Sequence, residues 1–190
     1  MENSPHFFFA VSLPIETKQQ IENACLGLKE LLPFKRWVHH EDYHITLAFL
    51  GSAPNDKLLL AKEHVKEGLH GQPGFSLKMH SIGTFGKADS PRIFWADTYE
   101  DNKLADIRSI VYHACTDAGF ELEKRPFRPH ITLARKWAGD EPLHKELLEK
   151  YNPFKQSSIA FSANEVVLYQ THLDRTPKYE RIATFPLSSE

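Results

Sequence analysis

The sequence contains little cysteine, with two cysteines among 190 residues. Cys25 and Cys115 fall on the apolar faces of expected helices, and neither has a partner at the spacing of a metal site or a redox pair. Such residues are typical of reduced core cysteines in an intracellular protein. Long hydrophobic runs are missing as well. The run at residues 7–11 is too short for a signal peptide or a membrane-spanning helix. We therefore expect a soluble, cytoplasmic protein, monomeric and without membrane contacts.

The chain also lacks an excess of charge of either sign. Its net charge of −2 excludes a protein that coats nucleic acid with its whole surface, so any nucleic acid must be held by a local patch. There is no low-complexity segment, and hydrophobic residues at 41% provide for a packed interior. A chain of this length fits one domain or two small lobes that share a core.

One five-residue sequence, His-Ile-Thr-Leu-Ala, occurs twice, at residues 44–48 and 130–134. Both copies are rich in residues that favour β-strands, and successive side chains of a strand face opposite sides. His44 and Thr46 therefore share one face, and His130 and Thr132 do the same in the second copy. The opposite face of the first strand is expected to carry Ile45, Leu47 and Phe49. Each copy predicts an imidazole beside a hydroxyl above an apolar underside.

The remaining pattern predicts an α+β protein. Apolar stripes at helical spacing indicate a helix between Pro14 and Pro33, one after Asn55 or Asp56, and one capped by Asp101 or Asn102. The stripes are Ile21, Ala24, Cys25, Leu28 and Leu31 in the first, Leu58, Ala61, Val65 and Leu69 in the second, and Leu104, Ile107, Val111, Ala114 and Ala118 in the third. A short helix is expected at 141–150. Further strands are expected at 7–11, 35–38, 75–79, around 82–85, 92–96, 158–161, 165–171 and 180–185.

The two halves of the chain repeat one order of elements: strand, helix, basic segment, motif strand, helix, more strands. This order favours a duplicated α+β unit with the two motif strands facing each other across a cleft. We expect residues 1–190 to form a single bilobal domain with one His-x-Thr motif in each lobe.

Two imidazoles that converge on one point suit a reaction that needs a general base and a general acid together. Their ordinary pKa of about 6.5 allows one to be neutral and the other protonated near pH 7. The hydroxyls of Thr46 and Thr132 can donate to the non-bridging oxygens of a phosphodiester, with attacking and leaving oxygens in line between the histidines. Lys35-Arg36, Lys124-Arg125 and Arg128 precede the motifs and can form a positive rim, although solvated surface charge is an equal explanation.

Two other chemistries have weaker support in the sequence. His39, His40 and His44 are close in the chain, but adjacent histidines of a strand face opposite sides, and no Asp, Glu or Cys recurs beside both motifs. No Ser or Cys stands in the context of a nucleophile elbow. The residues therefore predict a metal-independent acid–base site without a cofactor.

The doubled His-x-Thr motif resembles that of the two-histidine (2H) phosphoesterase superfamily. Within it the chain is similar to the RNA 2′,3′-cyclic phosphodiesterases, also called 2′-5′ RNA ligases. The likeness covers Phe7-Phe-Phe-Ala-Val-Ser-Leu-Pro14, Arg36-Trp-Val, His44-Ile-Thr-Leu-Ala-Phe-Leu-Gly51, Arg92-Ile-Phe-Trp-Ala96, Pro129-His-Ile-Thr-Leu-Ala-Arg135 and Val166-Val-Leu-Tyr. It implies two antiparallel sheets that line a central cleft, with helices outside and no metal.

The resemblance also implies roles for single residues. His44 is expected to be the proton donor, His130 the proton acceptor, and Thr46 and Thr132 the phosphate binders. Family members stack the terminal base between an aromatic residue of the first strand and the arginine after the second motif, here Phe9 and Arg135. Strict alternation would turn Arg135 away from the site, so this role requires a bulge near Ala134, and Phe9 has an equal explanation as a core residue.

The expected function is hydrolysis of RNA terminal 2′,3′-cyclic phosphates to 2′-phosphomonoesters. The alternatives are 2′-5′ RNA ligase or 2′-5′ phosphodiesterase activity and a non-catalytic module that binds RNA ends. The expected partners are RNA 3′ ends or small cyclic-phosphate nucleotides.

Overall fold

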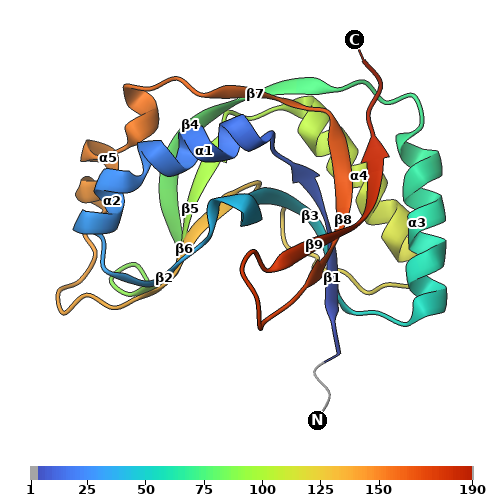
Figure 1. The fold of residues 1–190 in the computed structure, drawn as a ribbon, viewed down its shortest axis with the longest axis horizontal. Helices are drawn as coiled ribbons and strands as arrows, with labels where there is room; N and C mark the ends of the chain where they lie inside the picture. Colours follow the sequence, from blue (N-terminus) through green and yellow to red (C-terminus); the bar gives the residue numbers. More distant parts are fainter. Residues whose placement is uncertain (1–3, 190) are drawn as a thin grey trace.

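Two antiparallel sheets form the framework of the computed structural model, which describes residues 4–189 (Figure 1). The first sheet has four strands in the order β3-β1-β8-β9, and the second has five in the order β2-β6-β5-β4-β7. Every pairing between neighbouring strands is antiparallel. The predicted α+β class with two antiparallel sheets is thereby confirmed.

The elements follow one another along the chain in this order: β1 (His6–Ser12), α1 (Ile15–Ala24), α2 (Leu26–Leu31), β2 (Phe34–Trp37), the 3-10 helix η1 (His40–Asp42), β3 (His44–Ser52), α3 (Asn55–Leu69), β4 (Phe75–Gly86), β5 (Pro91–Thr98), α4 (Asn102–Asp117), β6 (Ile131–Trp137), α5 (Lys145–Lys150), the 3-10 helix η2 (Pro153–Lys155), β7 (Ala160–Ala163), β8 (Glu165–Thr171) and β9 (Tyr179–Pro186).

The two sheets do not correspond to the two halves of the sequence. The first sheet combines β1 and β3 with the last two strands, β8 and β9, whereas β2 belongs to the second sheet beside β6. Each sheet nevertheless carries one motif, because His44 opens β3 and His130 immediately precedes β6. Strands β3 and β6 approach each other, which brings the motifs together between the sheets.

The helices follow the predicted apolar stripes closely. All four stripe residues of α3 and the five stripe residues from Leu104 to Ala118 are buried, and the Asp101 carboxylate caps α4 by accepting a hydrogen bond from the Leu104 amide. Helices α3 and α4 pack on each other and on the first sheet, while α1 and α2 lie over the second (Figure 1). The predicted first helix is divided at Cys25, and Leu31 is exposed while Leu32 is buried, because α2 ends at Leu31.

One hydrophobic core joins the two sheets. Phe9 of the first sheet and Phe94 of the second belong to the same buried cluster, and both side chains are fully buried. Cys25 and Cys115 lie in this core as free thiols, as predicted. Between residues 4 and 189 there is no helix with the length and apolar character needed to cross a membrane.

Gly83 provides space for an indole ring beside the second motif strand. Trp95 pairs with Gly83 on one side and with Thr132 on the other. A Cβ atom on Gly83 would lie 2.4 Å from carbons of the Trp95 ring, which is closer than such atoms approach in proteins. The absence of a side chain at residue 83 therefore allows the Trp95 ring to lie against this strand.

We expect Gly83→Ala to lower the free energy of unfolding by about 1–3 kcal/mol, because Trp95 has to move to admit the methyl group. Gly27→Ala is the matched control, since a Cβ there meets nothing within 4 Å and alanine favours the helix by up to about 1 kcal/mol. Urea denaturation followed by tryptophan fluorescence measures both. A Gly83→Ala variant as stable as the wild type would contradict this account.

Candidate active site

The two motif histidines are held in the same way by their own backbone. The His44 Nδ1 atom lies 2.7 Å from the Asp42 carbonyl oxygen, and the His130 Nδ1 atom lies 2.8 Å from the Arg128 carbonyl oxygen. A carbonyl oxygen only accepts, so both Nδ1 atoms must carry the proton that is donated. The Nε2 atom is left for chemistry in each ring, and that of His44 lies 3.1 Å from the Thr46 hydroxyl.

Aromatic side chains from distant strands pack against both imidazoles. The Phe8 ring lies over His44 with centroids 4.7 Å apart, and the Tyr179 ring meets His44 edge-on at 5.1 Å. Phe85 packs edge-on against His130 at 4.9 Å. These rings limit the rotation of the imidazoles and exclude water from part of their surface.

Both motif strands contain a bulge at the same position. On β3, Thr46 pairs with Ala10 and Ala48 with Phe9, so Leu47 is an extra residue. On β6, Thr132 pairs with Trp95 and Ala134 with Phe94, so Leu133 is extra in the same way. A bulge shifts the alternation of faces, so the side chain after Ala turns to the face that carries His and Thr.

The bulges decide where Phe49 and Arg135 point. The prediction that Phe49 shares the buried face of Ile45 and Leu47 is wrong, because the bulge leaves Leu47 and Ala48 buried and Phe49 56% exposed. Arg135 lies at the equivalent position of β6. Burial raises the pKa of Tyr179 and lowers that of His44, and the positive charge of Arg135 lowers both pKa values by a smaller amount. The bulge that its predicted role requires is therefore present.

Of the two explanations given for Phe9, the structure supports the core residue. Its side chain is fully buried in the core and packs on Phe185, because it points to the helix-covered side of β1. The aromatic residue of β1 that faces the site is its neighbour Phe8, which is buried between His44 and Tyr169.

Asp42 connects the first motif to the β8–β9 hairpin. Its carboxylate is buried and accepts hydrogen bonds from the backbone amides of Lys178 and Tyr179 at 2.9–3.1 Å. Its backbone carbonyl accepts from His44. Asp42 thus positions the imidazole of His44 and also the β8–β9 hairpin, whose Tyr179 packs against this imidazole.

The surroundings make both imidazoles harder to protonate than a histidine in water. The pKa of His44 is lowered to about 4, mainly by burial; the positive charges of Lys18, His130 and Arg135 act in the same direction, and the hydrogen bond to the Asp42 carbonyl opposes them. Burial also lowers the pKa of His130, with Arg135 acting in the same direction and the Arg128 carbonyl opposing it. The ordinary pKa assumed from the sequence therefore does not hold.

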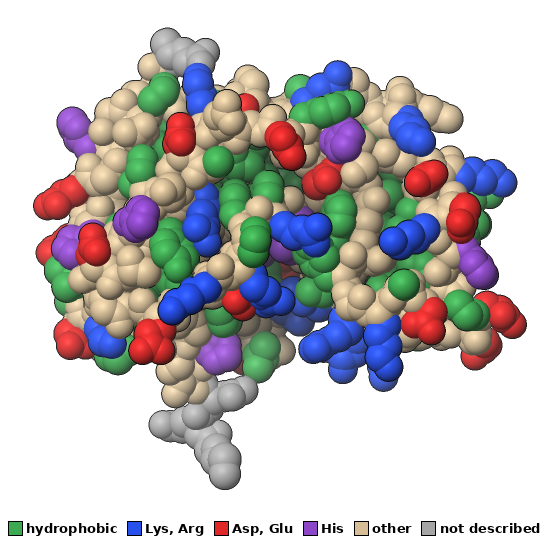
Figure 2. Space-filling model, turned by 180° about the vertical axis from the view of Figure 1, so that it is seen from behind, with side chains coloured by type: hydrophobic (Ala, Val, Ile, Leu, Met, Phe, Trp, Pro, Cys, Tyr) green, Lys and Arg blue, Asp and Glu red, His purple; other side chains and the backbone are tan. Residues whose placement is uncertain are grey.

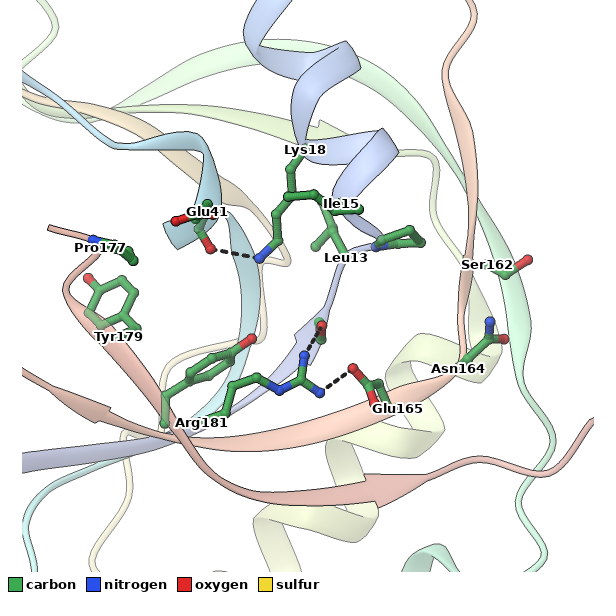
Figure 3. A pocket seen from close by; sticks show the side chains of 13 residues that line it. Leu13, Ile15, Lys18, Glu41, Ser162, Asn164, Glu165, Pro177, Tyr179 and Arg181 are labelled. Carbon is green, nitrogen blue, oxygen red and sulfur yellow. Dashed lines mark hydrogen bonds and ion pairs between the residues drawn. The ribbon is translucent and has the colours of Figure 1, made fainter.

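A cavity of about 620 Å³ lies on the first sheet, lined by residues that include Lys18, Glu41 and Arg181 (Figure 3). The buried Lys18 side chain reaches from α1 into this cavity and donates to the Glu41 carbonyl oxygen at 2.6 Å, while Arg181 pairs with Glu165 across the wall. Tyr179 lines the cavity and also touches His44. Lys18 thereby fixes the turn that precedes the first motif.

A larger groove of about 1150 Å³ starts at Thr46, His130 and Arg135 and extends outward to α4. We call this the basic groove, because its lining has seven cationic residues and one acidic residue, Glu123. The cationic residues are Arg36, Arg92, Arg108, Arg125, Arg128, Arg135 and Lys136. Lys and Arg side chains gather around the hollow in the middle of the face drawn in Figure 2. Of the predicted rim, Arg36, Arg125 and Arg128 line the groove, whereas Lys35 and Lys124 do not.

The described part of the chain contains no group of three or more His, Cys, Asp or Glu side chains that could hold a metal ion. His39 and His40 do not face opposite sides as expected for a strand. They stand at the start of η1, where their rings stack with centroids 4.6 Å apart and His40 pairs with Glu22.

Comparison with known proteins places this chain in a family. A family model described as the 2′-5′ RNA ligase superfamily matches residues 14–175. The chain belongs to the 2′-5′ RNA ligase superfamily. The predicted family is confirmed.

Relatives in this superfamily carry the name RNA 2′,3′-cyclic phosphodiesterase. The Bacillus subtilis protein is 36% identical over 186 residues, which cover 97% of both chains. The Geobacillus stearothermophilus protein is 46% identical over 182 residues, which cover 96% of this chain and 57% of that protein. The chain therefore spans little more than half the length of the second relative.

Solved structures of other proteins share the fold. Escherichia coli LigT complexed with 3′-AMP superimposes with a TM-score of 0.76 at 24% identity, covering 97% of this chain and 99% of that chain. A Thermus thermophilus protein superimposes with a TM-score of 0.75 at 21% identity, with the same coverage.

In this 2′-5′ RNA ligase superfamily member, several site residues carry no signal in the sequence. Phe8, Phe85 and Tyr179 look like ordinary strand aromatics, and only the tertiary structure brings their rings to the histidines. Asp42 precedes the first motif by two residues, but its contact with residues 178–179 spans most of the chain.

We expect His44 to remain neutral in the free protein until the pH falls to about 4, and Arg135→Gln to raise its pKa because a positive charge that disfavours protonation is removed. Arg175→Gln, which removes a charge that does not act on His44, is the control. NMR titration of the imidazole Cε1–H signals measures both. An unperturbed His44 titrating near 6.5, or no response to Arg135→Gln, would contradict this electrostatic account.

Proposed function

We propose that this protein hydrolyses the 2′,3′-cyclic phosphate at RNA 3′ ends to a 2′-phosphomonoester, without a metal ion. In this proposal His130 takes a proton from the attacking water and His44 gives a proton to the leaving 3′ oxygen. The hydroxyls of Thr46 and Thr132 hold the non-bridging oxygens, and Arg135 orients the terminal base. The names of the relatives support cyclic phosphodiester hydrolysis.

The observation that carries the proposal is the matched setting of the two imidazoles. Each has its Nδ1 atom committed to a backbone carbonyl two residues earlier, which leaves its Nε2 atom as the only nitrogen free to exchange a proton. The two rings come from different sheets, and the charge of one lowers the pKa of the other. In-line displacement at phosphorus needs such a pair, one on each side of the reacting atom.

The low pKa of His44 is compatible with a role as the acid once substrate is present. A phosphodiester anion beside the ring favours the imidazolium, because opposite charges at short range raise the pKa of a base. The Thr46 hydroxyl, which contacts Nε2 of His44 at 3.1 Å, can then donate to a phosphate oxygen instead. The positive charges that disfavour protonation of His44 in the free protein also attract the phosphodiester anion. Once bound, this anion raises the pKa of His44 again.

We expect His44→Ala and His130→Ala each to lower kcat by about 10²–10⁴-fold, since each removes one proton-transfer group. The double variant should be little worse than either single one, because the two act as a unit. His113→Ala, on the exposed side of α4, is the control. The assays use protein dialysed against EDTA. Near-normal turnover of either single variant would contradict the two-histidine mechanism, and activity restored only by zinc or manganese would contradict metal independence.

We expect the product to carry a 2′-phosphate. Only the ester oxygen beside the acid is protonated as it leaves, so a ribose with its 3′ oxygen against His44 yields the 2′-phosphomonoester. Phosphorus NMR of the product, or its resistance to a 3′-specific phosphatase, distinguishes the two isomers. A dominant 3′-phosphate would contradict this assignment of acid and base around the bound ribose.

A second activity, 2′-5′ joining of RNA, requires only that a 5′-hydroxyl replace water beside His130. The family description, which names 2′-5′ RNA ligases, supports it. Incubating the protein with an RNA 2′,3′-cyclic phosphate and a 5′-hydroxyl RNA, followed by electrophoresis, tests for the joined product.

A further inference from the structure

We propose that the basic groove binds the single-stranded RNA that precedes the reacting nucleotide, with Arg108 as a fixed phosphate-binding residue, so that the preferred substrate is an oligonucleotide rather than a cyclic mononucleotide. This inference rests on the proposed function and names its substrate class. The groove begins at His130 and leads along residues 125–128 to Arg108 and Tyr112 of α4.

Charge is the first argument. The groove lining holds seven of the 23 Lys and Arg residues but only one of the 25 Asp and Glu residues. Among the described residues, Arg125 is the only one of the seven cations that forms an ion pair, with Glu123. A cyclic mononucleotide brings a single negative charge, which the two motifs already serve. Further cations held close together without carboxylates match a chain of phosphates.

Aromatic side chains alternate with these cations. Phe49 is 56% exposed and lines the groove together with Phe85, which packs against His130, and with Tyr112 and Phe127, which pack against Arg108. Nucleic-acid bases stack on such rings whatever their sequence, whereas an acidic peptide has no flat rings to match them. A positive groove interleaved with aromatic rings therefore favours single-stranded RNA.

Arg108 is held in place before any ligand arrives. Its guanidinium carbon lies 4.2 Å from the centre of the Tyr112 ring and 5.4 Å from that of Phe127. Its Nε–H is buried and has no hydrogen-bond partner among the described residues. The two rings hold the guanidinium in place, so its terminal N–H groups can bind a phosphate oxygen with little loss of side-chain freedom.

The size of the groove also exceeds the need of one nucleotide. Its volume of about 1150 Å³ is above the upper end of the range typical for small-molecule pockets, about 300–1,000 Å³. The lining includes Thr46, His130 and Arg135 of the candidate active site, and the rest of it lies outside that site. The outer part, toward α4, is available for the nucleotides that precede the cyclic phosphate.

The test compares a cytidine 2′,3′-cyclic phosphate with RNAs of two, four and six nucleotides that end in the same group. We expect kcat/KM to rise about tenfold from the mononucleotide to the tetranucleotide, given the contribution of base stacking and phosphate contacts. The slope of log kcat/KM against log salt should steepen by about 0.7 for each added phosphate that is bound.

Arg108→Gln should lower the ratio of kcat/KM between tetranucleotide and mononucleotide several-fold, and Arg92→Gln, which also changes the groove lining, should do the same. Lys66→Gln, which removes one exposed charge from the outer helix α3, is the matched control and should leave the ratio unchanged. Unfolding midpoints of the variants confirm that the fold is intact. Fluorescence anisotropy with a labelled tetranucleotide ending in a 2′-phosphate gives a readout that does not depend on turnover.

Equal kcat/KM for all lengths would overturn this inference and leave the proposed function standing. Failure to hydrolyse any of the substrates would overturn the proposed function. RNA binding in the basic groove would then be tested by anisotropy with the labelled tetranucleotide. Salt-sensitive binding that Arg108→Gln weakens supports the inference, and the absence of such binding overturns it. Competition by oligoglutamate as strong as that by RNA would also overturn it.

Discussion

An extra residue in each motif strand, Leu47 in one and Leu133 in the other, is the constraint on which the cleft depends. The bulge lets two successive side chains, Leu and Ala, enter the core, where all four are at most 5% exposed. Burial of these side chains stabilises the core, and the bulge disrupts the hydrogen bonding between the strands at only one position. The next residue is turned toward the cleft, which brings Arg135 to the histidines and Phe49 to the groove. Without the bulges, both would point into the core.

The histidines combine local and distant support. Their Nδ1 atoms are fixed by carbonyls two residues earlier, so each motif carries its own orientation. The aromatic walls come from elsewhere: Phe8 belongs to the first strand, Phe85 to the second sheet, and Tyr179 to the last strand. Asp42 contributes to both kinds of support, because its carbonyl oxygen holds His44 while its carboxylate holds the β8–β9 hairpin at Tyr179.

Electrostatics connects the site to the basic groove. Positive charge collects along the groove, whose lining has a single acidic residue, in a chain whose net charge is −2. Burial is the main cause of the lowered pKa of both histidines, and the nearby positive charges lower these pKa values further. The positive charges also give the cleft a strong attraction for phosphates, which would restore the pKa values on binding. Substrate affinity and proton transfer thus depend on the same charges.

The sequence by itself determined the two His-x-Thr half-sites, the apolar stripes of α3 and α4, and the family, because a period of two or of 3.6 residues and a short repeated motif are local properties. It did not determine the faces of Phe49 and Phe9, since a bulge is one extra residue whose position depends on the neighbouring strand. Nor did it show that β8 and β9 complete the first sheet while β2 joins the second, because strand pairing across most of the chain is decided by shared burial. The lowered pKa values of the histidines and the basic groove also arise only from tertiary structure: burial and charge proximity exist only once distant segments have packed together.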